Sequence, residues 1–305
     1  MPPADPSAPI GTRGNLWPEP GNLQPGRVNN EQSMPKVTEL YRHPVKSFTP
    51  EPRGQLRVVD GRIAGDRVLA FRFADKGPAD NWAWQKKHNY VALVNTPGLA
   101  LLELEFDDES RRLSLNYHGE SFAEGSIDSE EDRRDLSEAV GEYVTSLDIN
   151  PLAGHPERVP LKLIGDGRQG VFHDSEAGEV TLYSTESLEA FESEVTTDTG
   201  TSVDGRRFRA NVVIDDVEAW EELSWTGRLT IGDGEYQVVK PVTRCLATHA
   251  NPASGERDMQ VMDHLVSANG IAAPTFAIRL ESVHPEIETS INLGDPVVVA
   301  QPASR

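Results

Sequence analysis

Glycine and proline divide this chain into short runs, which limits it to short secondary-structure elements. The sequence contains 25 glycines and 22 prolines. Between them, apolar and polar residues alternate with a period of two, as they do in strands that bury one face. Alternating runs in the first half lie at residues 36–41, 55–59, 68–73, 99–106 and 112–117. Because helical periodicity is scarce here, the pattern predicts a mainly β architecture of barrel or sandwich type.

One clear helix interrupts the strands near the middle of the chain. Leu136, Val140 and later apolar residues recur at helical spacing, which predicts a helix over residues 130–147. Ser129 or Asp128 can cap its first turn.

The second half returns to short strands and adds two short helices. Ser184 or Thr185 caps a predicted helix at residues 186–194, and another helix is expected at 259–267. Strands are expected at residues 161–164, 180–183, 209–214, 228–231, 236–241, 276–283 and 297–299. The fold class is therefore mainly β with short helices (α+β).

The composition of the chain changes at two places, which suggests its organisation. Residues 1–34 are rich in Pro, Gly and Asn, and they predict a disordered leader. The stretch at 154–160 is the candidate boundary between a first domain, residues 35–153, and a second domain, residues 154–303.

The formal net charge of −20 narrows the classes of partner. A chain this acidic is repelled by phosphate backbones, so we expect no nucleic-acid partner. No run approaches the about 18 apolar residues of a membrane helix, and the N-terminus lacks a secretory signal pattern. We therefore expect a cytoplasmic protein without a membrane partner. Arg206, Arg207 and Arg209 nevertheless crowd together, which favours an anionic small molecule, with surface ion pairing as the alternative.

Cys245 is the only cysteine of the chain. A single thiol forms no internal disulfide and no four-thiolate zinc or iron–sulfur site. It can act as a nucleophile, or as one thiolate ligand of a metal whose other ligands come from a cofactor. The alternative is a small buried apolar residue. The eight histidines lack zinc-type spacing, and none is selected by sequence as the partner that a Cys–His hydrolase would need.

Two short segments give Cys245 a more specific setting. The first is His43-Pro-Val-Lys-Ser47, followed by Gly65-Asp-Arg67. The second is Arg207-Phe-Arg-Ala-Asn211, followed by Arg244-Cys245 and by Asn251-Pro-Ala-Ser-Gly255. In this order and spacing the motifs resemble the MOSC family, which is named for the C-terminal domain of molybdenum cofactor sulfurase. They are most similar to proteins that also have an N-terminal MOSC β-barrel domain, such as the mitochondrial amidoxime reducing component and its bacterial relatives.

The resemblance implies a barrel-like N-terminal domain, a MOSC β-barrel domain and a molybdenum-cofactor (molybdopterin) site. Cys245 matches the family thiolate that binds molybdenum, a role that suits soft sulfur. The other matched positions hold the pterin and its phosphate: Lys46, Ser47, Arg67, Ser184, Thr185, Arg209, Asn211 and Arg244. Basic and hydroxyl donors suit phosphate, and so does a helix start. Arg67 and Arg209 could instead be buried ion-pair partners, and Asn211 could bond backbone groups at a strand end.

The chain departs from the family pattern at several positions. His43 stands where Tyr is usual, and Ala210 stands where Pro is frequent. Residues 247–252 replace a Thr-Thr-Val-Asp-Pro segment, which places His249 four residues after the cysteine. His249 is then either a substrate or proton contact or a plain turn residue. Asp174 lies near an Asp of the family pattern.

By resemblance, the chain is expected to be a molybdenum-cofactor oxidoreductase that reduces small N-hydroxylated compounds such as hydroxylamines and amidoximes. With one cysteine it cannot hold an iron–sulfur cluster, so its electrons must come from a separate reductase or ferredoxin-like partner. One alternative is a sulfur-carrier or cofactor-handling protein with a Cys245 persulfide, and another is a cofactor-binding module without catalysis. Pyridoxal phosphate is not expected as a cofactor, because the chain has no room for the domain that binds it in the family's sulfurases.

Overall fold

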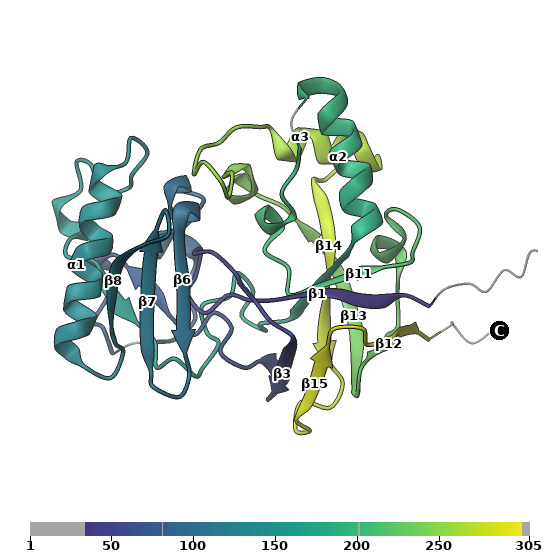
Figure 1. Cartoon of the computed structure of the whole chain (residues 1–305), viewed down its shortest axis with the longest axis horizontal. Coiled ribbons are helices and arrows are strands. Elements are labelled where there is room, and N and C mark those ends of the chain that lie inside the picture. The colour runs from purple at the N-terminus through teal and green to yellow at the C-terminus, as the bar shows by residue number, and fades with distance from the viewer. Residues whose placement is uncertain (1–33, 81, 201, 301–305) are drawn as a thin grey trace, which may run out of the picture. The chain divides into compact units, whose positions relative to one another are not determined.

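Figure 1 shows the chain as a computed structural model, which describes residues 34–80, 82–200 and 202–300. Strands make up most of its regular elements, and the described residues form three α-helices: α1 (Glu130–Ser146), α2 (Thr185–Thr199) and α3 (Val261–Asn269). The predicted mainly β class with short helices is confirmed. The predicted leader lies outside the described residues except for Met34, and so do residues 301–303.

The largest sheet has eight strands in the order β16-β12-β13-β14-β10-β11-β1-β2. β1 runs across the direction of β13 and β14 (Figure 1), and it returns to the far edge of the sheet, where Lys36 bridges Pro296 just before β16. The sheet therefore curls toward closure as a barrel, as the resemblance predicts. Its strands are β1 (Lys36–Arg42), β2 (Glu51–Pro52), β10 (Val180–Ser184), β11 (Val212–Asp215), β12 (Arg228–Ile231), β13 (Gly234–Thr243), β14 (Thr275–Ser282) and β16 (Val297–Val299).

The neighbouring strands β10 and β11 of this curled sheet are buried on both faces. Leu182 and Val212 belong to an apolar cluster on one face, while the adjacent Tyr183 and Val213 belong to a second cluster with residues of α2 and α3. A strand that is buried on both faces needs apolar residues in succession, which explains why β11 reads Val-Val-Ile. The two helices thus cover one face and fix the strand ends beside them.

Three smaller sheets complete the chain. β15 (Thr289–Asn292) pairs with β3 (Gln55–Val59), which pairs with β4 (Arg62–Ile63), and β5 (Ala70–Arg72) pairs with β9 (Lys162–Ile164). β6 (Leu102–Asp107), β7 (Arg112–Tyr117) and β8 (Glu120–Ser126) form an antiparallel meander. Helix α1 packs on this meander, burying the apolar face that its sequence period predicts.

Several predicted boundaries are wrong. The predicted strand at 209–214 begins only at Val212, because a 3₁₀ turn at Gly205–Phe208 precedes it and Arg209 has a left-handed backbone (φ 50°). The predicted strand at 99–106 begins at Leu102, after a 3₁₀ turn at Pro97–Leu101. β8 and β15 had no predicted counterpart. The domain boundary near residue 153 stays a prediction.

Among the described residues, none of the helices has both the length and the apolar character required to cross a membrane.

The start of α1 offers a test of local stability. The Ser129 hydroxyl accepts a hydrogen bond from the Asp132 backbone N–H at 3.2 Å. We expect Ser129→Ala to lower the free energy of unfolding by about 1 kcal/mol, because that donor loses its partner. Urea denaturation followed by circular dichroism measures the change.

Thr145→Ala is the matched control, since it removes a hydroxyl from the exposed last turn of the same helix. Alanine is a good helix former, so this variant should be no less stable than the parent. Equal losses in the two variants would show that Ser129 does not act as a cap.

Candidate functional site

Seven of the nine predicted site residues line one cavity of about 310 Å³. They are Lys46, Ser47, Arg67, Arg209, Asn211, Arg244 and Cys245. Seven basic side chains and two carboxylates line this cavity in all, although the whole chain carries a net charge of −20. The other lining residues with charge are Lys87, Arg207, Arg279, Asp174 and Glu179. A cavity of this kind is suited to an anionic ligand.

Three of these residues have a left-handed backbone, which non-glycine residues rarely adopt. Their φ angles are 71° at Ser47, 50° at Arg67 and 50° at Arg209. Each such residue costs about 1 kcal/mol or more, so it persists only where the surrounding structure holds it. The carboxylate of Asp66, which is 0 % exposed, accepts the His43 backbone N–H at 2.6 Å and so fixes two of the three turns to each other.

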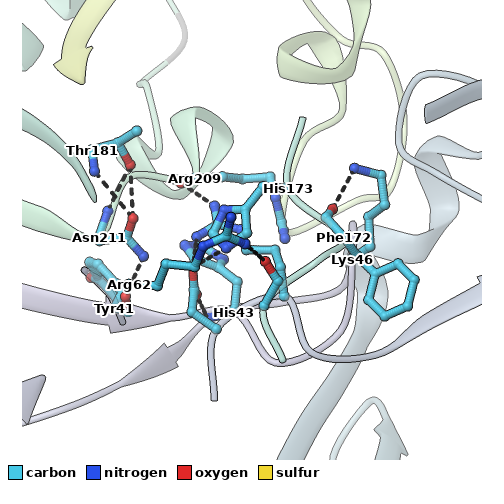
Figure 2. A network of polar contacts seen from close by, with 12 residues as sticks. Tyr41, His43, Lys46, Arg62, Phe172, His173, Thr181, Arg209 and Asn211 are labelled. Carbon is cyan, nitrogen blue, oxygen red and sulfur yellow. Dashed lines mark hydrogen bonds and ion pairs between the residues drawn. The ribbon is translucent and has the colours of Figure 1, made fainter. Parts of the chain in front are cut away.

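Lys46 is almost completely buried inside this arrangement. Its Nζ donates to the Phe172 carbonyl oxygen at 2.8 Å, as Figure 2 shows, and to an Asp174 carboxylate oxygen at 2.6 Å. Desolvation lowers the pKa of Lys46, although Asp174 opposes this effect. Desolvation would raise the pKa of Asp174, but the charge and hydrogen bond of Lys46, together with the charges of Lys87 and Arg67, outweigh it and hold that pKa well below its usual range. The pair is therefore ionised, with the ammonium of a buried lysine against a carboxylate that is partly exposed.

Arg67 and Arg209 are linked through the backbone. Arg67 pairs with Asp66 and donates from Nη2 to the Arg209 carbonyl oxygen at 2.9 Å. Arg209 donates from Nη1 to the Phe48 carbonyl oxygen, while its Nη2 is buried without a hydrogen-bond partner. Desolvation, followed by the charge of Arg67, lowers the pKa of Arg209 to about 9. The unpartnered donor marks a place where an acceptor would be stabilised.

Arg244, next to the cysteine, repeats this pattern. Its Nε donates to the Phe276 carbonyl oxygen at 2.9 Å and its Nη1 donates to the Phe208 carbonyl oxygen at 3.0 Å. Its Nη2 is buried without a partner, and desolvation lowers its pKa to about 10. Two guanidinium groups in one cavity thus each keep one unused donor.

Cys245 lies just beyond the end of β13, at the start of a 3₁₀ turn (Leu246–His249). Its Sγ is 3.1 Å from the Nζ of Lys87. Desolvation works against the charge on Lys87, but Asp174 and the contact with Cys245 together outweigh it and raise the pKa of that ammonium. A negative charge on the sulfur would therefore face a positive charge directly.

Arg207 holds the loop that follows the cysteine. It donates to the His249 carbonyl oxygen at 3.0 Å and to both carboxylate oxygens of Asp258 at 2.7 Å. His249 itself is buried, does not line the cavity, and its Nε2 lies 3.4 Å from the Met262 backbone N–H. This placement agrees with the turn residue among the two alternatives for His249.

Asn211 lines the cavity, but its side chain joins three strands. Figure 2 shows its amide between Thr181 and Tyr41: Oδ1 accepts from the Thr181 hydroxyl at 3.0 Å, and Nδ2 donates to the Tyr41 carbonyl oxygen at 3.2 Å. This geometry agrees with the alternative in which Asn211 bonds backbone groups at a strand end. It also positions the neighbouring Arg209.

Ser184 and Thr185 are not brought to this cavity. The Ser184 hydroxyl caps α2 and donates to the buried carboxylate of Glu222 at 3.1 Å. The Thr185 hydroxyl donates to the Ile214 carbonyl oxygen at 3.1 Å. Both side chains are used within the fold, which explains why their predicted role does not match their position.

Sequence reasoning missed Lys87 and His173. Lys87 lies in a 3₁₀ turn (Lys87–Asn89) without a periodic pattern, and no motif marks it. His173 is buried beside Lys46 and Arg209 (Figure 2), and its Nε2 has no hydrogen-bond partner. Desolvation lowers the pKa of His173 to about 4, against the opposing charge of Asp66. Its position between Phe172 and Asp174 is the one signal that could have pointed to it.

The donor set fits an anionic cofactor that one protein thiolate attaches. In the described ranges, no group of three or more His, Cys, Asp or Glu side chains could hold a metal ion alone. The cavity instead offers one thiol, three unused guanidinium donors on Arg207, Arg209 and Arg244, and a net excess of positive charge.

Comparison with known proteins agrees with this setting. Residues 169–298 match the MOSC domain family. Molybdenum cofactor sulfurases of Drosophila pseudoobscura pseudoobscura and Drosophila erecta are 33% and 32% identical over 95 and 99 residues. The match covers 30% of this chain and only 12% of each relative.

Two solved structures are also similar. YiiM from Geobacillus stearothermophilus is 15% identical with a TM-score of 0.29, and the match covers 40% of this chain and 54% of that one. The YuaD protein from Bacillus subtilis is 14% identical with a TM-score of 0.36, and the match covers 87% and 94%.

The unused guanidinium donors predict that the ligand-free protein binds a small oxyanion. Pyrophosphate at about ten times its dissociation constant should stabilise the protein by about 1.4 kcal/mol, or about 3 °C in melting temperature. Arg209→Met should lose this shift, whereas Arg134→Met, on the exposed face of α1, should keep it. Thermal melts against sodium chloride of equal ionic strength measure the effect. A shift of equal size in Arg209→Met would contradict the assignment.

The buried imidazole of His173 predicts a pH effect on stability. In the unfolded chain the imidazole of His173 is protonated once the pH falls below about 6.5, whereas in the folded protein it stays neutral until the pH approaches 4. Stability attributable to His173 should therefore fall by up to about 3 kcal/mol as the pH drops from 6.5 to 4. His173→Gln should flatten this part of the curve in urea titrations, and His284→Gln, which alters an exposed ring, should not. Parallel curves for the parent and His173→Gln would refute the prediction.

Proposed function

Because residues 169–298 form a MOSC domain, we propose that this chain binds a molybdenum–pterin cofactor in the cavity around Cys245 and works as an oxidoreductase. The observation that carries the proposal is the meeting of the only thiol of the chain with unused guanidinium donors of three arginines in one cationic cavity. The names of the curated relatives support a role connected with this cofactor.

Different residues of the cavity would hold different parts of the cofactor. Cys245 supplies the thiolate ligand for the metal, since soft sulfur suits it. Arg209 and Arg244 offer their free Nη2 atoms to anionic oxygens, and Arg67 and Lys46 add positive charge close to them. Asn211 and Asp66 act through position, because they hold the turns that carry these groups. When bound, the cofactor supplies a redox-active metal next to the thiolate.

The reaction we propose is reduction of an N-hydroxylated compound. One N–O bond breaks as two electrons and two protons are taken up, which gives the N–H compound and one molecule of water. The protons come from solvent. The electrons come from a flavin or an iron–sulfur cluster outside these 305 residues, because their single cysteine cannot ligate a cluster.

The sulfur-carrier alternative is favoured by one contact. The Lys87 ammonium lies 3.1 Å from the sulfur, and a persulfide anion on Cys245 would be stabilised by it. Mass spectrometry of the intact protein separates the two readings: an added sulfur atom on Cys245 without molybdenum supports the carrier, and molybdenum without the added sulfur supports the oxidoreductase.

Replacement of the cysteine tests the proposal. Cys245→Ser should lower molybdenum from about one atom per chain to a small fraction, because a hydroxyl is a poor ligand where a thiolate is required. Reduction of an amidoxime with a chemical or protein electron donor should fall in parallel. Elemental analysis of protein from a cofactor-producing host measures the first quantity.

Ser254→Ala, in the loop beyond the cysteine, is the control and should keep both molybdenum and activity. If Cys245→Ser retained its molybdenum and its activity, the thiolate would not be the metal ligand and the proposal would fail.

A further inference from the structure

Lys87 occupies a special position among the basic residues of the cavity. It comes from the segment between β5 and β6, whereas the cysteine follows β13, and its Nζ lies 3.1 Å from Sγ. The nearest carboxylate oxygen to that ammonium belongs to Asp174 and is 4.0 Å away. Asp174 directs its other oxygen to Lys46 at 2.6 Å, so one carboxylate is shared between two ammonium groups. The charge of Lys87 is therefore only partly compensated.

Five of the other six basic side chains of the cavity are hydrogen-bonded to the fold, and the sixth, Arg279, lies 3.7 Å from a carboxylate oxygen of Glu179. Lys46 contacts a carbonyl and a carboxylate, Arg67 pairs with Asp66, and Arg207 makes two bonds to Asp258. Arg209 and Arg244 each spend donors on carbonyl oxygens. These groups are fixed by the protein, while Lys87 contacts only the reactive sulfur at close range.

Exposure separates Lys87 from the deep end of the cavity. The side chain of Lys46 is 5% exposed, that of Lys87 is 36% exposed and that of Asp174 is 57% exposed. Lys87 is thus the more exposed of the two lysines that line the cavity, and it is in contact with the cysteine.

We infer that Lys87 makes this site select substrates that carry a carboxylate or phosphate close to the N-hydroxylated group. This inference rests on the proposed function, and it names the class of substrate. An oxyanion that approaches the sulfur gains a charge-assisted hydrogen bond from a partly desolvated ammonium. The reaction keeps the balance given above, with electrons from the flavin or iron–sulfur partner, and Lys87 itself is unchanged by it.

The first experiment needs neither cofactor nor turnover. The single thiol of cofactor-free protein is alkylated with iodoacetate, which is anionic, and with iodoacetamide, which is neutral. The ratio of the two rates reports the local charge, because both reagents react with the same thiolate and its abundance cancels. Lys87→Met should lower the iodoacetate-to-iodoacetamide ratio by about fivefold, since one partly exposed positive charge is lost.

Two variants act as controls for this measurement. Lys86→Met removes an exposed positive charge one residue away and should leave the ratio at the parent value. Lys87→Arg keeps the charge and should also keep the ratio, which guards against a fold defect in Lys87→Met. An unchanged ratio in Lys87→Met would overturn the inference.

The second experiment uses the cofactor-loaded enzyme with a matched pair of phenyl amidoximes, with and without a para carboxylate. The ratio of kcat/KM for the carboxylated over the neutral compound should fall about fivefold in Lys87→Met and stay constant in Lys86→Met. An equal ratio in the parent and Lys87→Met would also overturn the inference. If the loaded parent reduces neither compound, the proposed reduction fails, whereas the alkylation ratio still decides whether Lys87 favours anions at the cysteine.

Discussion

Burial of positive charge around one cavity is the constraint on which the rest of this structure depends. A guanidinium removed from water is unfavourable unless acceptors replace the water. Carbonyl oxygens of Phe48, Phe208 and Phe276 supply them here, and each lies at a strand end or turn. Those turns require left-handed residues, such as Arg209, and the curled sheet with its covering helices holds them in place. The guanidinium donors that have no acceptor within the protein favour ligands with anionic oxygens.

The sequence predicts the fold well where one interaction dominates. The period of α1 and its serine cap, and the alternation in β3 and β7, are local patterns that burial of one face enforces. Prediction fails where tertiary contacts override local preference. Residues 209 and 210 resemble the start of a strand, yet they follow a 3₁₀ turn and the left-handed backbone of Arg209 keeps them out of the sheet. β8 escaped prediction because several of its side chains are exposed, so alternation is weak.

The candidate site was also predicted only in part. The family motifs identified seven residues that line one cavity, but they did not show which of these side chains can contact a ligand and which support the fold. Asn211 and Arg207 use their polar groups within the protein, and this depends on partners such as Tyr41 and Asp258 that are distant in sequence. Lys87 could not be identified from sequence, because its contact with Cys245 forms only when the 3₁₀ turn that carries it packs near the end of β13. A contact between two residues that are far apart in the sequence leaves no motif or periodicity around either of them.

The central claim is that the ligand of this cavity is an anionic molybdenum cofactor attached through Cys245. Anomalous diffraction from a crystal of the molybdenum-loaded protein, measured on both sides of the metal's absorption edge, tests it most directly. The account predicts one strong molybdenum peak beside Sγ of Cys245, with oxyanion density within reach of Arg209 and Arg244. A molybdenum peak elsewhere on the protein, with the cavity filled only by water, would contradict it.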